Sequence, residues 1–201
     1  MEPTDHNMRA FDDLHRRRNE PRGGLPPIVA ATLGDLTQKR VLHLRSGGGG
    51  ASAELAQQGA VVTAVDPSEE TVDAAREQWP SILWIQADAQ SLPAELQRGR
   101  FDLVYSPEGT LWELGDLDAW AAGIVAALQA HGELLVYDAH PVALCVDGLQ
   151  RWKYDYFAEG FWRLGKIVTT LVRAGFSIEA LEEYPGERRL PGTFLLYARR
   201  V

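Results

Sequence analysis

Apolar runs of strand length alternate along the chain with segments whose apolar residues recur at helical spacing. The runs that predict strands are residues 41–44, 61–65, 82–85, 101–105, 134–137, 176–181 and 193–198. The segments that predict helices are residues 9–19, 28–36, 54–59, 69–79, 91–97, 116–129 and 166–174. We expect Ser68 to cap the fourth of these helices, Gly132 to end the sixth and Gly175 to end the last.

The order of these segments predicts an α/β fold. Strands that alternate with helices favour a Rossmann-like, doubly wound and mostly parallel sheet with helices on both faces. Only the turn Tyr184-Pro185-Gly186 and a polar loop separate the last two apolar runs, so these should form a C-terminal antiparallel hairpin. We therefore expect a seven-stranded sheet in a single domain over residues 1–201, with an N-terminal arm at 1–27 and an aromatic insert at 141–165.

A glycine-rich turn follows the first predicted strand. Gly47 to Gly50 allow backbone conformations that are closed to other residues and remove side chains that would keep a ligand away. The next strand ends at Asp66, where a carboxylate can accept hydrogen bonds from a ribose diol. The stretch 41–66 therefore predicts a site for an adenosine-containing molecule.

Polar residues also follow the other parallel strands. Because ligands of such sheets bind beyond the carboxyl ends of the strands, Ser46, Asp66, Asp88, Ser106 and His140 should gather at one edge. Asp88 and the N–H of the residue after it are placed to bind an adenine ring. The glycine turn fits the dinucleotide pattern only in part, and a closing hairpin is unlike a dinucleotide-binding sheet.

Composition excludes several classes of protein. A net charge of −8 and a pI near 5.1 argue against a nucleic-acid partner. Cys145 is the single cysteine, so we expect neither an internal disulfide nor a thiolate metal site, and we predict no metal. The longest apolar run, 119–128, is far shorter than a membrane span, and no signal peptide is recognised. We expect a cytoplasmic protein without a membrane partner.

At this point the chain resembles the class I S-adenosylmethionine-dependent methyltransferases, and it looks closest to small bacterial members. The segments that carry the resemblance are VLHLRSGGGG, VVTAVDPSEETVDAAR, IQADAQSLP, FDLVYSPEGTLWELGDLDAW and GFSIEALEEYP with FLLYARR. The resemblance implies S-adenosylmethionine as cofactor. The residues that we assign to cofactor binding are Arg45, Ser46, Gly47, Gly48, Gly49, Asp66, Pro67, Asp88, Ala89 and Ser106. In that family the three glycines would wrap the methionine part, Asp66 would hold the ribose hydroxyls, Asp88 with Ala89 would bind adenine, and Ser106 would border the sulfur.

Two residues depart from the family pattern. His43 stands where most members have an acid that helps to fix the cofactor's ammonium group, and Arg45 replaces the first glycine of the turn. A neutral imidazole can accept a hydrogen bond, whereas a charged one would repel an ammonium. Arg45 either pairs with a nearby carboxylate at the strand end or clamps a carboxylate of the cofactor or substrate.

Aromatic residues are concentrated between residues 152 and 162. They could bind a planar or cationic substrate, or form the apolar underside of a lid. The residues that we assign to substrate binding are Trp112, Trp152, Tyr156 and Trp162, although Trp112 could instead pack the following helix. The basic run 15–18 of the N-terminal arm could face the cofactor's carboxylate or end a solvated helix.

His140 is the first candidate for a catalytic base, with Asp138 placed to orient it, and Glu108 is the second. His140 could instead cap the backbone before Pro141. The leading hypothesis is methyl transfer to a small-molecule acceptor by a monomer or homodimer. A protein that binds the cofactor without catalysis and an NAD-dependent oxidoreductase are the alternatives.

Overall fold

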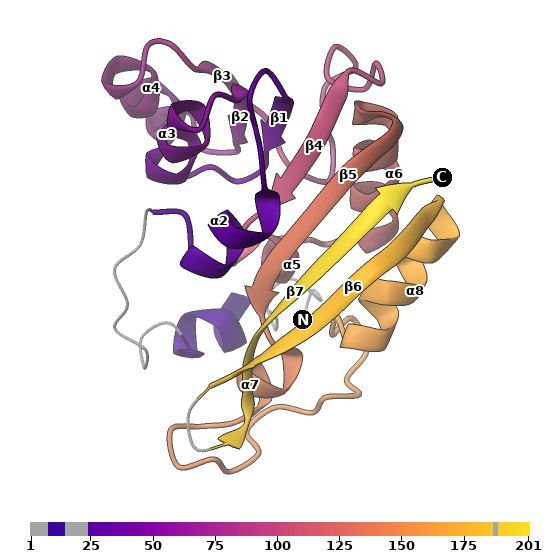
Figure 1. Cartoon of the computed structure of the whole chain (residues 1–201). Coiled ribbons are helices and arrows are strands. Elements are labelled where there is room, and N and C mark those ends of the chain that lie inside the picture. Colours follow the sequence, from indigo (N-terminus) through magenta and orange to yellow (C-terminus); the bar gives the residue numbers. More distant parts are fainter. Residues whose placement is uncertain (1–7, 15–23, 187–188) are drawn as a thin grey trace.

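A computed structural model describes residues 8–14, 24–186 and 189–201 of the chain (Figure 1). Its seven-stranded sheet has the order β3-β2-β1-β4-β5-β7-β6. The strands are β1 (Arg40–His43), β2 (Val61–Asp66), β3 (Leu83–Gln86), β4 (Phe101–Ser106), β5 (Leu128–Ala139), β6 (Phe176–Pro185) and β7 (Pro191–Arg200). The first five strands pair in parallel, and β7 is antiparallel to both of its neighbours. The predicted fold class and the closing hairpin are confirmed.

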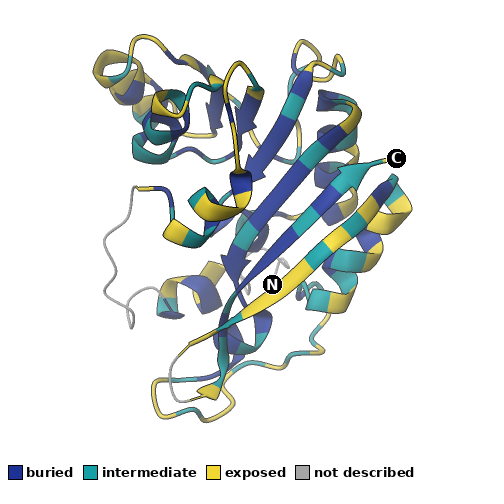
Figure 2. Ribbon diagram, in the orientation of Figure 1, coloured by how far each residue is buried: buried dark blue, intermediate teal, exposed yellow. Residues whose placement is uncertain are grey.

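Helices cover both faces of this sheet. The helices are α2 (Pro27–Leu33), α3 (Gly50–Gln57), α4 (Glu69–Gln78), α5 (Thr110–Glu113), α6 (Leu117–Ala127), α7 (Pro141–Cys145) and α8 (Leu164–Ala174), with a further helical segment at residues 8–14. Buried residues of α2, α3 and α4 form one apolar cluster, and those of the remaining helices form the other. The central strands β1, β4 and β5 between the two clusters are largely buried, whereas the edge strand β6 is mostly exposed (Figure 2).

Local signals explain where several helices begin and end. The Ser68 hydroxyl accepts a hydrogen bond from the Thr71 N–H, 3.2 Å away, and so caps α4 as predicted. Asp116 caps α6 in the same way. Gly175 ends α8 with φ of 106°, a left-handed conformation that favours glycine.

One predicted helix and one predicted helix end are wrong. Residues 91–97 form turns instead of a helix, with Leu96 and Gln97 donating backbone hydrogen bonds to residues three positions earlier. Helix α6 ends at Ala127, and β5 begins at once, because Leu128 pairs with Phe101 of β4. Gly132 therefore lies inside a strand and does not end the helix. At the end of α6, pairing between strands overrides the local helical pattern.

The helical segment at residues 8–14 packs on the same face as α5 and α7. Ala10, Phe11 and Leu14 are buried, as the pattern of the predicted helix 9–19 requires. The basic run 15–18 lies outside the described residues. Asp13 accepts hydrogen bonds from Lys153 and Tyr154, so this segment contacts the aromatic insert. None of the described helices is long and apolar enough to cross a membrane.

Candidate functional site

The strand order reverses direction between β1 and β4, and the glycine turn follows β1 at this point. Ser46 anchors the turn, because its N–H donates to the Val65 carbonyl at 3.0 Å. A Cβ atom added to Gly47 or Gly48 would meet nothing within 4 Å. The outer surface of the turn is therefore open to a ligand, at the position where doubly wound sheets bind one.

Gly49 has a different role in the turn. Its φ is 85°, and a Cβ atom there would lie 2.6 Å from the Trp84 ring and 3.0 Å from that of Trp79. Side chains are excluded at this residue both by the backbone conformation and by the two indoles beneath it. Gly49 is thus needed for packing, whereas Gly47 and Gly48 leave space on the ligand side.

Asp66 lies beside the turn at the end of β2 and is mostly buried. Its Oδ2 accepts a hydrogen bond from the Gly47 N–H at 3.0 Å, and its Oδ1 accepts one from the Ser68 N–H at 3.0 Å. A carboxylate can accept about four hydrogen bonds, so Asp66 keeps capacity for two more donors. Pro67 comes next, and its carbonyl accepts from the Gln86 side chain at 3.2 Å.

Asp88 and Ala89 follow β3, the neighbour of β2. The exposed Asp88 carboxylate accepts hydrogen bonds from the backbone and side-chain nitrogens of Gln90, at 2.9 and 3.2 Å. Within the described part of the chain, the N–H of the buried Ala89 has no hydrogen-bond partner. Gln90 in turn accepts the N–H groups of Gly115 and Asp116, so this loop is tied to the segment after α5.

These residues fit an adenosine ligand with an amino-acid tail. The open turn, Asp66 and the Asp88–Ala89 pair come from three adjacent strands and lie at the same edge of the sheet. Ser106 ends β4 and is fully buried, and its Oγ has no hydrogen-bond partner among the described residues. The donors and acceptors that an adenosine would use are therefore present and are not consumed by the fold.

His43 lies within the core, on the α3 side of the sheet. Its Nδ1 is 2.7 Å from the Ser52 hydroxyl, and its ring stacks on Tyr105 with centroids 5.0 Å apart. Burial lowers the pKa of His43 to about 3, so the imidazole is neutral at ordinary pH. His43 thus cannot provide the negative charge of the acid that it replaces.

Because the His43 imidazole is buried and neutral, we predict that the stability of the folded protein depends on pH. Between pH 6.5 and 3 the unfolded chain binds a proton at His43 and the folded chain does not, so acid favours unfolding. Relative to the His43→Asn variant, wild-type stability should fall by about 1.4 kcal/mol per pH unit below pH 6.5. Urea unfolding of both proteins from pH 8 to pH 4.5 measures this difference. A difference that does not vary with pH would contradict a buried neutral His43.

Arg45 reaches from the glycine turn to Glu113 at the end of α5. Arg45 Nη1 forms an ion pair with Glu113 Oε2, as the first of the two sequence interpretations expects. The backbone of Arg45 has φ of 43°, in the left-handed region that few residues other than glycine adopt. The ion pair therefore links the glycine turn after β1 to the end of α5. Arg45 forms it from a strained backbone conformation.

Asp138, at the end of β5, is fully buried and was not predicted as a structural residue. Its Oδ1 accepts the N–H groups of Gly109 and Ala139 at 2.9 and 2.7 Å, and its Oδ2 accepts that of Leu111 at 3.1 Å. Burial raises the pKa of Asp138 to about 8, Glu108 adds to the rise, and the three N–H donors oppose it. The carboxyl group holds the loop between β4 and α5 in place.

Asp138 consequently does not orient His140, contrary to the prediction. The Nδ1 of His140 accepts the Val142 N–H at 3.1 Å and caps α7, which is the alternative that the sequence left open. The Nε2 of His140 lies 2.8 Å from a carboxylate oxygen of Glu183 on β6. Burial is the largest influence on His140 and lowers its pKa, while Glu183 opposes this effect. Glu108 is half-buried near Asp138.

The four aromatic residues assigned to substrate binding do not form one surface. Trp112 is fully buried and stacks on Phe161, with ring centroids 5.9 Å apart. Trp162 donates a hydrogen bond from its indole N–H to the Leu114 carbonyl at 2.9 Å. Tyr156 is half-buried, and Trp152 is exposed. The insert thus packs on α5 through some aromatic rings and presents others to solvent.

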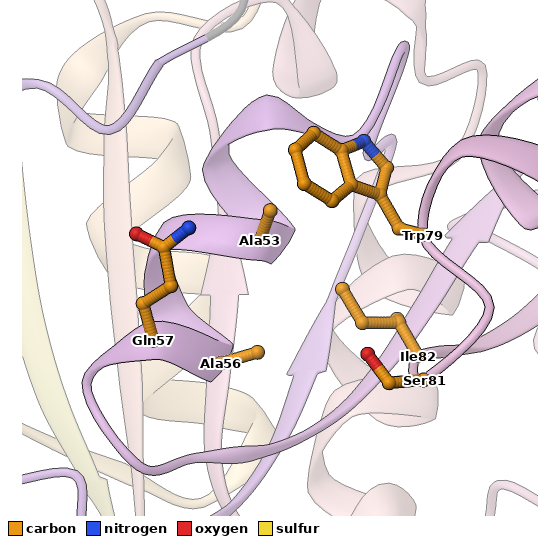
Figure 3. Close-up of a pocket in the computed structure, with 6 residues that line it drawn as sticks. All are labelled: Ala53, Ala56, Gln57, Trp79, Ser81 and Ile82. Atoms are coloured by element: carbon orange, nitrogen blue, oxygen red, sulfur yellow. The ribbon is translucent and has the colours of Figure 1, made fainter.

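A separate pocket of about 300 Å³ lies between the second half of α3 and the segment before β3 (Figure 3). It is lined by Ala53, Ala56, Gln57, Trp79, Ser81 and Ile82. These residues lie toward the beginning of β3 rather than its carboxyl end, so the pocket is distinct from the predicted site. No cluster of His, Cys, Asp or Glu suited to a metal ion occurs among the described residues.

Known proteins resemble this chain in sequence and in structure. Residues 41–132 match a family model described as a methyltransferase domain. An uncharacterized methyltransferase from Synechocystis is 33% identical over 104 residues, which are 51% of this chain and 48% of the relative. The chain therefore spans about half the length of that relative.

Solved structures match over most of the chain. An S-adenosylmethionine-dependent methyltransferase from Mesorhizobium loti has a TM-score of 0.75 and 26% identity, with coverage of 87% of this chain and 96% of the other. The magnesium protoporphyrin IX methyltransferase of Synechocystis, with bound S-adenosylhomocysteine, has a TM-score of 0.62 and 19% identity. The latter match covers 97% of this chain and 95% of the other, and it shows a shared fold.

Proposed function

We propose that the chain is a class I S-adenosylmethionine-dependent methyltransferase and that it transfers a methyl group from this cofactor to a small-molecule acceptor. One observation carries the proposal. An open glycine turn lies at the switch point of the sheet, beside Asp66 and Asp88 at the ends of the two neighbouring strands. When bound, the cofactor supplies an electrophilic methyl group on a sulfonium ion.

Different residues of the chain would bind different parts of the cofactor. Asp66 has two acceptor positions left for the ribose hydroxyls. The unpartnered Ala89 N–H and the Asp88 carboxylate suit the edge of an adenine ring. Gly47 and Gly48 leave room for the amino-acid end, and Pro67 and Ser106 border the same edge of the sheet.

The acceptor would bind next to α5 and the insert. Residues 8–14 and 141–165 contact each other through Asp13 and together would cover this side of the site. Methyl transfer depends mainly on alignment of the acceptor, and a base is needed only when the acceptor loses a proton. His140 and Glu108 are the proposed bases for such an acceptor, with Trp152, Tyr156 and Trp162 as the proposed contacts to it.

Thermal unfolding with different ligands tests the cofactor. At about a hundredfold excess over its Kd, S-adenosylhomocysteine should stabilise the protein by about 2.7 kcal/mol. For a chain of this size this corresponds to a rise in Tm of roughly 5–10 °C. NAD at the same concentration is the control and should give no shift. A shift with NAD alone would favour an oxidoreductase and refute the proposal.

Transfer of label tests catalysis separately from binding. The protein is incubated with S-adenosylmethionine carrying a labelled methyl group and with fractions of small-molecule extract, and the label should move to an acceptor. The Arg45–Glu113 pair and the neutral His43 favour a second candidate, a protein that binds the cofactor without transferring its methyl group. Binding of S-adenosylhomocysteine without transfer to any fraction would support this second function.

A further inference from the structure

The ion pair between Arg45 and Glu113 lies at the mouth of the site. The side chain of Arg45 is 24% exposed and that of Glu113 is 32% exposed, so a ligand can reach both groups. Arg45 belongs to the turn after β1, and Glu113 is the last residue of the helix that follows β4. The pair therefore spans the switch point at which the strand order reverses.

The surroundings of Arg45 place its guanidinium group among the acids of the site. Burial lowers the pKa of Arg45, and the nearby carboxylates of Asp66, Asp138 and Asp88 oppose this effect. Two of these carboxylates are the proposed contacts to ribose and adenine. The ion pair thus adjoins the position of the nucleoside and is not a separate surface contact.

The backbone of Arg45 indicates that its side chain is needed. A residue with a Cβ atom in the left-handed region costs on the order of 1–2 kcal/mol, which glycine would avoid. A partly exposed ion pair such as this one contributes only about 0–1 kcal/mol to stability and does not offset this strain. The strain points to a role for the guanidinium group in binding.

The amino-acid end of S-adenosylmethionine or S-adenosylhomocysteine carries one ammonium group and one carboxylate. His43 supplies no negative charge for the ammonium group, because it is neutral and buried and its Nδ1 lies 2.7 Å from the Ser52 hydroxyl. Arg45 and Glu113 offer one positive and one negative group beside the open surface of the turn. An inserted zwitterion would replace one ion pair with two and leave no charge unpaired.

We propose that the Arg45–Glu113 pair is the subsite for the amino-acid end of the cofactor. The pair opens, the guanidinium group of Arg45 binds the ligand's carboxylate, and the carboxylate of Glu113 binds the ligand's ammonium group. The negative charge that His43 does not supply is thus provided from α5. The assignment rests on the proposed function, since it names the residues that hold one end of the proposed cofactor.

Calorimetric titration with two ligands tests the subsite. S-adenosylhomocysteine carries the amino-acid end, and 5′-methylthioadenosine has the same nucleoside without it. In Glu113→Gln and in Arg45→Gln, the Kd for S-adenosylhomocysteine should rise about 10-fold or more, the equivalent of about 1.4 kcal/mol. The Kd for 5′-methylthioadenosine should stay within about 2-fold, because the nucleoside contacts are untouched. Glu77→Gln, an exposed substitution on α4, is the matched control and should change neither Kd.

Three other outcomes of the calorimetric titration would contradict the proposed subsite. An unchanged ratio of the two affinities in both variants would overturn the subsite while leaving the proposed function intact. Tighter binding of S-adenosylhomocysteine by Glu113→Gln would also overturn it, because Glu113 would then only compete for Arg45. If the wild-type protein binds neither ligand, the proposed function fails and the subsite fails with it.

Discussion

Replacing Asp66 with alanine will remove the thermal stabilisation of the protein by S-adenosylhomocysteine. Two hydrogen bonds from ribose hydroxyls to a carboxylate contribute about 1.5–3 kcal/mol each. Their loss corresponds to a Kd about 100-fold higher or more. At a ligand concentration that shifts the wild-type Tm by several degrees, the variant should show no measurable shift. Asp66 also accepts the Gly47 and Ser68 N–H groups, so the turn loses an anchor as well.

Two controls separate these effects. Asp73→Ala removes an exposed carboxylate of α4 that pairs with Arg76 in its own helix, and its response to ligand should equal that of wild type. Asp66→Asn keeps the size of the side chain but retains only one good acceptor, so its affinity should lie between those of wild type and Asp66→Ala. An unchanged shift in Asp66→Ala would refute the proposed role of Asp66.

Replacing Asp138 with alanine should give the largest loss of stability of any substitution considered for this chain. The change leaves the N–H groups of Gly109, Leu111 and Ala139 without their acceptor in the core. Each buried unsatisfied donor costs about 1–3 kcal/mol, and three donors near the lower end of this range give an expected total loss of about 3–5 kcal/mol. The corresponding fall in Tm is roughly 6–20 °C for a chain of this size.

Urea unfolding and differential scanning calorimetry measure this loss. Asp73→Ala is again the matched control, because an exposed pair within one helix should contribute less than about 0.5 kcal/mol. The expectation fails if Asp138→Ala loses less than about 1 kcal/mol. That result would mean that the loop between β4 and α5 finds other acceptors or water.

The sequence predicted those parts of the fold that depend on local pattern. Apolar runs located every strand, and the alternation of elements led to the correct sheet. The predicted cofactor residues do lie at one edge, because parallel strands in a doubly wound sheet end on the same side. Asp66 and Asp88 could therefore be placed without knowledge of any tertiary contact.

The remaining features depend on contacts between distant parts of the chain. Arg45 and Glu113 are 68 positions apart, and nothing local to either residue identifies its partner. In the sequence, Asp138 is simply a polar residue at the end of a strand. Its carboxyl oxygens accept hydrogen bonds from N–H groups of a loop that lies 27 and 29 residues earlier in the chain. The early start of β5 at Leu128 similarly follows from its pairing with β4.

The packing beneath Gly49 has a kinetic consequence. The rings of Trp79 and Trp84 pack against the turn at Gly49, so the backbone of the turn is ordered before a ligand binds. Binding therefore costs the turn little conformational entropy. A nucleoside alone should therefore associate in a single fast step, limited by encounter and by loss of water. A ligand with an amino-acid tail must also separate Arg45 from Glu113, and this second event would set the slower rate.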